Sequence, residues 1–239
     1  MKSVPLLVVR PEPGNAATLA AAKAMGLAAH GEPLFEIVPL AWKPPLATAF
    51  DAVLIGSANV MRHGGEAVKR YAALPAYVVG QATAEAARQT GFAVAAVGSG
   101  GLQGLVAQLV HDRRRLVLRL AGAEHIPLTT PPETAVETVV VYQARPLLLR
   151  AAGAAMLRGC VVVMLHSAAA ARHLAAECER LALPHEVIAL ACLGTRVAAA
   201  AGGGWAFVAS AERPDDTALL ALAARMCQNS DFGDTDSNS

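Results

Sequence analysis

Two serines in this sequence each follow a buried strand pattern and precede a helical pattern, which makes both of them candidates for binding an anion. Ser57 follows the apolar residues 52–55, and Ser167 follows residues 161–165 in a second copy of the same pattern. The first backbone N–H groups of a helix have no partner within the helix, so they bind anions readily. A capping role alone would account for each serine and would stabilise its helix by about 1 kcal/mol. The repetition favours a shared ligand.

The repeat contains a second helix start in each copy. Gly80 ends one strand pattern and Gly194 ends the other, and a helical pattern begins within three residues of each. These positions would again present backbone donors, together with side-chain amide and hydroxyl groups. The candidate anion-binding residues of the repeat are therefore Ser57, Ala58, Gly80, Gln81, Thr83, Ser167, Gly194 and Thr195.

Two further candidate donors lie at predicted strand ends. Arg10 follows the apolar residues 6–9, and His166 directly precedes Ser167. Ligands of parallel α/β sheets bind at the carboxyl ends of the strands, so each side chain is predicted to bind a carboxylate. Arg119 and His125 flank an irregular, proline-containing segment and are additional candidates of the same kind.

The repeat also includes an Arg-His pair in each copy, at residues 62–63 and 172–173. Both pairs lie about a turn and a half into their predicted helices. We therefore predict that they face solvent or pack against neighbours and take no part in ligand binding.

Residues 46–135 alternate between short apolar runs and helical patterns. Continuously apolar runs that alternate with helices indicate a parallel sheet covered on both faces. The predicted strands are residues 52–55, 76–79, 93–97 and 116–120, and the predicted helices are residues 57–73, 83–89 and 102–109. Residues 123–135 contain three prolines and are predicted to form a loop.

The alternation resumes after residue 147 but lacks a first strand. The predicted helices are residues 147–157, 167–181, 195–201 and 215–226, and the predicted strands are residues 161–165, 187–190 and 206–208. The strand and helix at residues 6–9 and 16–25 would complete this second set. The chain would then begin one domain, build the other domain whole, and return to the first.

Two extended segments are predicted to join the domains. Residues 34–40 are punctuated by prolines, which suits an edge strand, and residues 137–142 form a strong β pattern that would pair with them. The predicted fold is α/β, with two similar lobes joined by a two-stranded β bridge and a discontinuous first domain. The predicted boundaries are residues 1–35 with 146–228 for domain one, 43–136 for domain two, 36–42 and 137–145 for the bridge, and 229–239 for a disordered polar tail.

The composition excludes several classes of protein. Hydrophobic residues make up 54% and charged residues 16% of the 239, yet no apolar run reaches the roughly 20 residues that span a bilayer. The N-terminus lacks the pattern of a secretion signal, so a cytoplasmic protein is expected. Four cysteines without a CxxC pair favour reduced structural thiols over disulfides or a metal site. A net charge of +1 and 4% aromatic residues provide no basis for nucleic-acid binding.

The chain resembles the uroporphyrinogen-III synthase family over nearly its whole length up to the tail. The resemblance lies in the order of its motifs, because no single motif is decisive. That order comprises an interrupted domain, two Ser-Ala helix starts, two G-x-x-T-A-like turns, and a tyrosine in the bridge between them. The segments that carry the resemblance are residues 8–11, 50–60, 79–92, 139–146, 161–173 and 192–202.

The resemblance implies two α/β lobes joined by a β-ladder and an enzyme that acts on hydroxymethylbilane, a linear tetrapyrrole. Such a lyase removes water, inverts ring D and closes the macrocycle to uroporphyrinogen III in haem biosynthesis. Tyr142 matches the family's tyrosine, and a phenol is protonated at pH 7, so Tyr142 is the expected donor to the leaving hydroxyl. No cofactor or metal is expected, and the predicted state is a monomer with at most transient contact with the preceding enzyme of the pathway.

The chain departs from the family pattern at several positions. The family has Thr-Ser before the first helix of each repeat, whereas this chain has Gly56-Ser57 and His166-Ser167. The second turn reads Gly194-Thr195-Arg196-Val197-Ala198, in which Thr195 would replace the missing hydroxyl. A family helix with a basic residue is replaced after Gly122 by the proline-containing loop that carries His125. These departures bear on substrate contacts more than on the fold.

Three alternative functions stay open from the sequence. A two-lobed small-molecule binding protein without catalysis is disfavoured by the missing secretion signal. A nucleotide-dependent α/β enzyme is disfavoured because the glycine clusters at residues 98–101 and 202–204 match no phosphate-binding motif. A family member that has lost activity is suggested by the change at residues 196–197.

Overall fold

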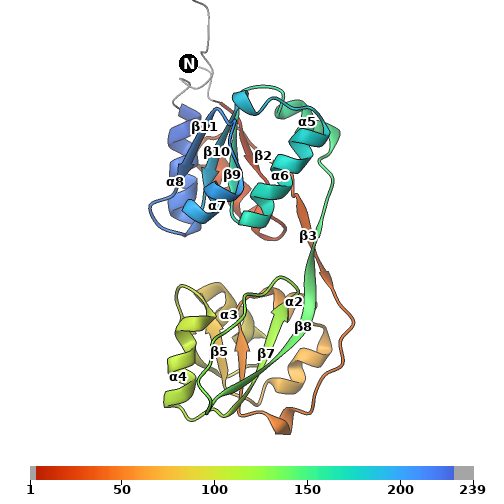
Figure 1. Cartoon of the computed structure of the whole chain (residues 1–239), viewed down its shortest axis with the longest axis vertical. Coiled ribbons are helices and arrows are strands. Elements are labelled where there is room, and N and C mark those ends of the chain that lie inside the picture. The colour runs from red at the N-terminus through yellow and green to blue at the C-terminus, as the bar shows by residue number, and fades with distance from the viewer. Residues whose placement is uncertain (1–3, 229–239) are drawn as a thin grey trace, which may run out of the picture. The chain divides into compact units, whose positions relative to one another are not determined.

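The computed structural model describes residues 4–228, so the predicted tail lies outside the described residues. The chain divides into two compact units. Within the described residues, unit 1 comprises 4–36 and 146–228, and unit 2 comprises 37–145 (Figure 1). The N-terminal strand therefore belongs with the second half of the chain, since β1 pairs in parallel with β9.

Unit 1 contains a five-stranded sheet in the order β11-β10-β9-β1-β2, counted over the described residues. The paired strands are parallel. Its strands are β1 (Leu6–Val8), β2 (Ala29–Gly31), β9 (Val161–Leu165), β10 (Ile188–Cys192) and β11 (Phe207–Ser210). Its helices are α1 (Gly14–Ala24), α5 (Ala151–Met156), α6 (Ala168–Arg180), α7 (Thr195–Ala200) and α8 (Asp216–Gln228).

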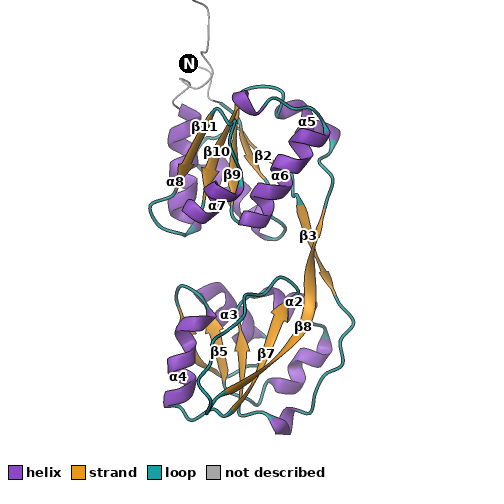
Figure 2. Cartoon of the chain, viewed as in Figure 1, coloured by secondary structure: helices purple, strands orange, loops and turns teal. Residues whose placement is uncertain are grey.

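The two faces of this sheet are buried by different helices, because successive strand residues point to opposite faces. Leu6 and Met164 pack in one cluster with α8 residues such as Leu219. Their neighbours Leu7 and Val163 are also fully buried, on the face that α6 and α7 cover (Figure 2). Burial on both faces explains why these strands read as continuous apolar runs.

Unit 2 contains a six-stranded sheet in the order β3-β8-β7-β4-β5-β6, again within the described residues. Its strands are β3 (Phe35–Pro39), β4 (Ala52–Ile55), β5 (Ala76–Val79), β6 (Val94–Gly98), β7 (Leu116–Gly122) and β8 (Ala135–Pro146). Its helices are α2 (Asn59–His63), α3 (Gln81–Gln89) and α4 (Val106–His111). From β8 to β6 the paired strands are parallel, so their carboxyl ends meet at one edge.

The strands β3 and β8 carry the chain between the units. The backbone N–H of Leu40 donates to the carbonyl oxygen of Val141, and the N–H of Leu147 donates to that of Leu34. A later residue on the β3 side thus pairs with an earlier residue on the β8 side. The two strands are therefore antiparallel. β3 is the edge strand of its sheet, a position that tolerates its one proline, Pro39.

The predicted helix at residues 57–73 is wrong as a single element. The structure has the five-residue α2, then a break at Gly64 and Gly65, then a 3₁₀ helix at Glu66–Tyr71. Gly65 has φ 70°, and a side chain at Gly64 would lie 2.6 Å from the carbonyl oxygen of Val60. Two glycines thus turn the chain where helical periodicity alone predicts continuation.

One prediction for unit 1 also needs correction. The predicted helix at residues 147–157 is limited to α5, because backbone groups before it bind side chains elsewhere in unit 1. The N–H of Leu149 donates to Glu177, and that of Arg150 donates to Glu32. The sequence interpretation also missed β2, whose three residues give no apolar pattern.

Candidate functional site

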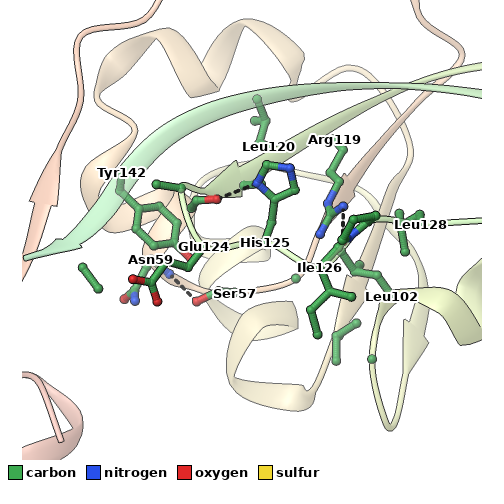
Figure 3. A pocket seen from close by; sticks show the side chains of 18 of the residues that line it. Ser57, Asn59, Leu102, Arg119, Leu120, Glu124, His125, Ile126, Leu128 and Tyr142 are labelled. Atoms are coloured by element: carbon green, nitrogen blue, oxygen red, sulfur yellow. Dashed lines mark hydrogen bonds between the residues drawn. The ribbon is translucent and has the colours of Figure 1, made fainter. Parts of the chain in front are cut away.

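A pocket of about 630 Å³ lies in unit 2 at the carboxyl ends of β4, β5, β7 and β8. Parallel α/β sheets bind ligands at this edge. Its polar side chains come from the turn after β4, from the 3₁₀ helix Leu102–Leu105, from β7 and the segment that follows it, and from β8 (Figure 3). The lining side chains used below are those of Ser57, Asn59, Leu102, Arg119, His125, Ile126, Leu128 and Tyr142.

Tyr142 lies at a bulge where β8 leaves its regular register with β7. Ala121 pairs with Val140 and Gly122 pairs with Tyr142, so β8 has one extra residue here. A bulge redirects the side chain next to it. The ring of Tyr142 lies so close to Gly122 that an added Cβ would be 2.6 Å from ring atom Cε2. Glycine at 122 therefore leaves room for the tyrosine ring at the pocket wall.

Ser57 lines the pocket, but its capping role differs from the predicted one. Its Oγ accepts a hydrogen bond from the N–H of Asn59 at 3.2 Å, and Ala58, which is buried, stands at the N-cap position of α2. Because α2 has only five residues, its dipole is weaker than that of the predicted long helix.

Arg119 is a buried cation in the middle of β7. Only 5% of the residue is exposed, and its neighbours Leu118 and Leu120 are fully buried. Nη1 donates to the carbonyl oxygen of Ile126 at 2.8 Å, whereas Nε has no partner. Burial lowers the pKa of Arg119, opposed by the nearby Tyr142, but a guanidinium remains charged at pH 7. The pocket thus contains a fixed positive charge.

His125 lies on the segment between β7 and β8. Its Nδ1 lies 3.0 Å from the carbonyl oxygen of Gly122, to which it donates when protonated. Together with the Arg119–Ile126 bond, this contact holds the proline-containing segment at the edge of the pocket. The sequence analysis placed Arg119 and His125 beside an irregular segment. The position of Arg119 inside the predicted strand at residues 116–120 was a signal that it is buried, but that signal was not used.

The predicted residues at the second helix start of unit 2 do not line this pocket. Gly80, with φ 80°, links β5 to α3 and stands at its N-cap position. Thr83 is buried in the first turn of α3, and Gln81 is exposed. The structure therefore brings Ser57 and Tyr142 together at one pocket and leaves Gly80, Gln81 and Thr83 outside it.

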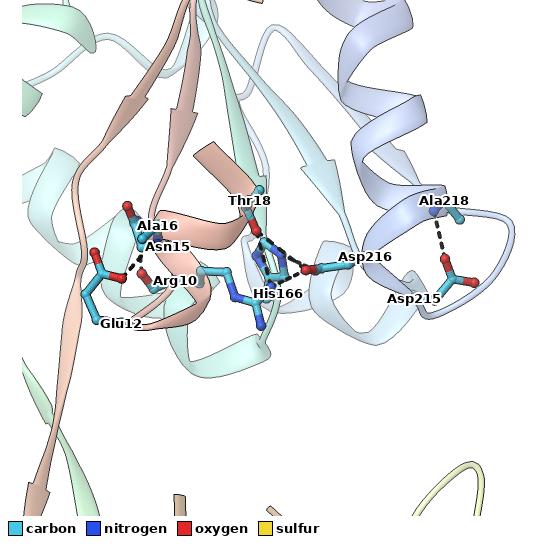
Figure 4. A network of polar contacts seen from close by, with 9 residues as sticks. All are labelled: Arg10, Glu12, Asn15, Ala16, Thr18, His166, Asp215, Asp216 and Ala218. Atoms are coloured by element: carbon cyan, nitrogen blue, oxygen red, sulfur yellow. Dashed lines mark hydrogen bonds and ion pairs between the residues drawn. The ribbon is translucent and has the colours of Figure 1, made fainter. Parts of the chain in front are cut away.

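In unit 1, Arg10 and His166 meet at Asp216 in the first turn of α8 (Figure 4). Nη1 of Arg10 pairs with Oδ2 of Asp216 and donates to Thr18 at 3.3 Å. Nε2 of His166 lies 2.8 Å from Oδ1 of Asp216, while its Nδ1 is buried without a partner. Both predicted carboxylate donors are thus engaged by a carboxylate of the chain itself.

The hydrogen bond from His166 is the main cause that lowers the pKa of Asp216 to about 2. The charge of Arg10 acts in the same direction, and burial opposes it. Asp216 is therefore an anion at neutral pH, so an added carboxylate at this position would be repelled unless Arg10 or His166 turned away from it.

The other predicted residues of unit 1 lie at neighbouring strand ends. Ser167 is the N-cap of α6, and its Oγ accepts from the N–H of Ala170 at 3.1 Å. Gly194 and Thr195 begin the six-residue α7, where Gly194 is extended. The pairing of Leu165 with Cys192 places both helix starts at the same edge of the sheet.

The described residues contain no group of three or more His, Cys, Asp and Glu side chains placed to hold a metal ion. Within the same residues, no helix combines the length and the apolar character needed to cross a bilayer.

Comparison with known proteins shows what the chain is similar to. A profile of the uroporphyrinogen-III synthase HemD family matches residues 16–221. The structure is similar to uroporphyrinogen-III synthetase from Helicobacter pylori, with a TM-score of 0.64 and 16% identity over 93% of this chain and 99% of that one. It is also similar to a mutant uroporphyrinogen III synthase from Thermus thermophilus, with a TM-score of 0.52 and 17% identity over 95% and 99% of the chains. A search of curated proteins found no match.

At these identities the structural likeness concerns the fold. It confirms the predicted class, an α/β protein with two lobes built on mainly parallel sheets and a discontinuous first lobe.

Proposed function

The chain belongs to the uroporphyrinogen-III synthase family, and from this premise we propose which of its residues bind and convert the substrate. The protein is a cyclising lyase of tetrapyrrole and haem biosynthesis that forms uroporphyrinogen III from hydroxymethylbilane. The reaction removes water, inverts ring D and closes the ring.

The substrate sets three requirements for the protein. Its eight carboxylates need donors, its departing hydroxide needs a proton, and its flexible chain must be held so that its two ends meet. Positioning of reacting groups and donation of a proton in the transition state both lower the barrier. A site with fixed donors and one neutral acid satisfies these requirements without a cofactor.

Tyr142 is the proposed proton donor. The observation that carries this assignment is its place on the wall of the unit 2 pocket, which Ser57 and the buried charge of Arg119 also line. A phenol at this position can donate to the leaving hydroxyl while the neighbouring groups hold the substrate. The close contact with Gly122 restricts where the ring can lie.

The remaining proposed donors bind carboxylates of the substrate. In unit 2 these are Ser57, Ala58, Gly80, Gln81 and Thr83, and in unit 1 they are Arg10, His166, Ser167, Gly194 and Thr195. Ser167 precedes the 13-residue α6 and is the best supported of them, since a long helix has the larger dipole. Arg10 and His166 now pair with Asp216, so each would bind a substrate carboxylate only after giving up its contact with Asp216.

The test is the Tyr142→Phe enzyme supplied with hydroxymethylbilane, with separation of the product isomers. Loss of the acid should lower kcat by about 10²- to 10⁴-fold, and isomer I from spontaneous closure should then dominate. Tyr71→Phe is the matched control, because the Tyr71 hydroxyl donates to Pro45 in the same unit and does not line the pocket. A Tyr142→Phe enzyme with unchanged turnover would rule out the acid role.

The proposed setting of the protein is the cytoplasm, with the enzyme acting as a monomer. Any contact with the preceding enzyme of the pathway is proposed to be transient. Sedimentation of the purified chain at micromolar concentration tests the monomeric state, since a stable dimer would contradict it.

A further inference from the structure

Arg119 is the one charged side chain in the unit 2 pocket, among the described residues, that is almost fully buried. Across residues 4–228 it makes a single hydrogen bond, from Nη1 to Ile126, and no ion pair. Burying a charge without a counterion is costly, so such groups are normally paired. The position therefore needs an explanation outside the folded chain itself.

A purely structural role does not require a guanidinium. The bond to Ile126 holds the segment after β7, but any side chain with an N–H of similar reach could donate it. That role also leaves Nε buried and without a partner. An arginine at this place has two more donor groups than the scaffold uses.

The surroundings of Arg119 define the ligand that fits it. The pocket wall around it includes the apolar side chains of Leu102, Ile126 and Leu128. In such surroundings a guanidinium attracts an anion more strongly than it does in water. Its planar fork matches a carboxylate, which can accept from Nε and one Nη at the same time.

We propose that Arg119 is the receptor for one acetate or propionate side chain of the substrate, and that it thereby selects bilanes that have a carboxylate at that position. This assignment rests on the proposed function of the pocket. The incoming carboxylate accepts a hydrogen bond from Nε, which has no partner in the folded chain, and neutralises the buried charge. The same group would position the chain end that reacts beside Tyr142.

Three substitutions separate this role from a scaffold role. Arg119→Met removes both the charge and the donor, Arg119→Gln keeps an N–H for Ile126 without charge, and Arg119→Lys keeps the charge without the fork. Arg115→Met is the matched control, because Arg115 is exposed in the same unit and does not line the pocket.

The measurements are KM and kcat with hydroxymethylbilane and the inhibition constant of uroporphyrin III, an octacarboxylate probe. Arg119→Met and Arg119→Gln should each raise KM and the inhibition constant by about 10- to 100-fold, the usual effect of losing a hydrogen bond to a charged group. Arg119→Lys should recover part of the loss, and kcat should change less than KM. The melting temperature of Arg119→Met should equal or exceed that of the wild type, because an unpaired buried charge has been removed.

Three results would overturn the assignment. Wild-type affinity in Arg119→Gln would show that the side chain serves only as a donor to Ile126. Unchanged constants in Arg119→Met would show that no carboxylate binds there. Inhibition by sulfate as strong as that by uroporphyrin III would show a general anion site with no selection for a substrate carboxylate. Failure of the proton-donor role would appear instead in the isomer ratio of Tyr142→Phe, which the binding constants do not report.

Discussion

Replacing Gly122 by alanine should impair catalysis more than folding. The new Cβ would lie 2.6 Å from Cε2, 2.7 Å from Cζ and 3.0 Å from the hydroxyl oxygen of Tyr142. An ordinary contact begins at 3.4 Å, so the ring must move by 3.4 − 2.6, or about 0.8 Å. Gly122 does not have a positive φ, so alanine brings no backbone strain.

The ring is the outer part of a side chain and can swing away, so the steric cost should reach only ~1 kcal/mol, the low end for overpacking. Its hydroxyl, however, would leave the position from which it donates. A misplacement of about 1 Å at a reacting group can lower the rate by about 10²-fold. We therefore expect kcat to fall by about 10- to 100-fold while the protein still folds.

The assay supplies hydroxymethylbilane to Gly122→Ala, Tyr142→Phe and the double variant, and separates the isomers formed. If alanine acts through the ring, the double variant should be no slower than Tyr142→Phe. Gly104→Ala is the control, since a Cβ there meets no atom within 4 Å. Wild-type turnover in Gly122→Ala, or losses that add in the double variant, would refute the reasoning.

Three further predictions concern unit 1. Ser167→Ala removes the cap of α6 and should lower the free energy of unfolding by about 1 kcal/mol, measured by urea denaturation; Ser57→Ala, which removes no N-cap, should lower it less. Glu177→Ala should cost about 1–3 kcal/mol, because it leaves the buried N–H of Leu149 without its acceptor, and a variant as stable as the wild type would contradict this. Asp216→Asn should cost about 1 kcal/mol at pH 7 after allowance for solvent screening. Because the folded pKa of Asp216 is lowered from 3.8 to about 2, this contribution is present above about pH 4 and is lost as the pH falls toward 2. The wild type and Asp216→Asn should therefore converge in their free energy of unfolding over that range. A constant difference between them would contradict the ion-pair interpretation.

The strands and their parallel arrangement could be predicted because they depend on local pattern. Runs such as Val161–Leu165 are apolar at every position since both faces of the sheet are covered. The second set of strands and helices lacked a first strand, and the strand pattern at residues 6–9 was the one left to supply it. The repeated Ser-helix starts followed from the same periodicity, although the length of α2 did not, because two glycines override its helical pattern.

The partners of the side chains could not be predicted in this way. Asp216 is 206 residues from Arg10 and 50 from His166, and no local pattern links them. Arg119 reads as an interruption of an apolar run, and only the packed sheet shows that it is buried with a free Nε.

The amino-acid sequence by itself determined the fold class, the returning N-terminal strand and the set of strand ends that bear donors. The tertiary structure alone decided which donors share a pocket. It set the Tyr142 ring over Gly122 through a bulge of one residue, and it left Arg119 as a buried charge beside them. The reason is physical: periodicity reports which face of an element is buried, whereas contacts between distant residues depend on register, bulges and packing.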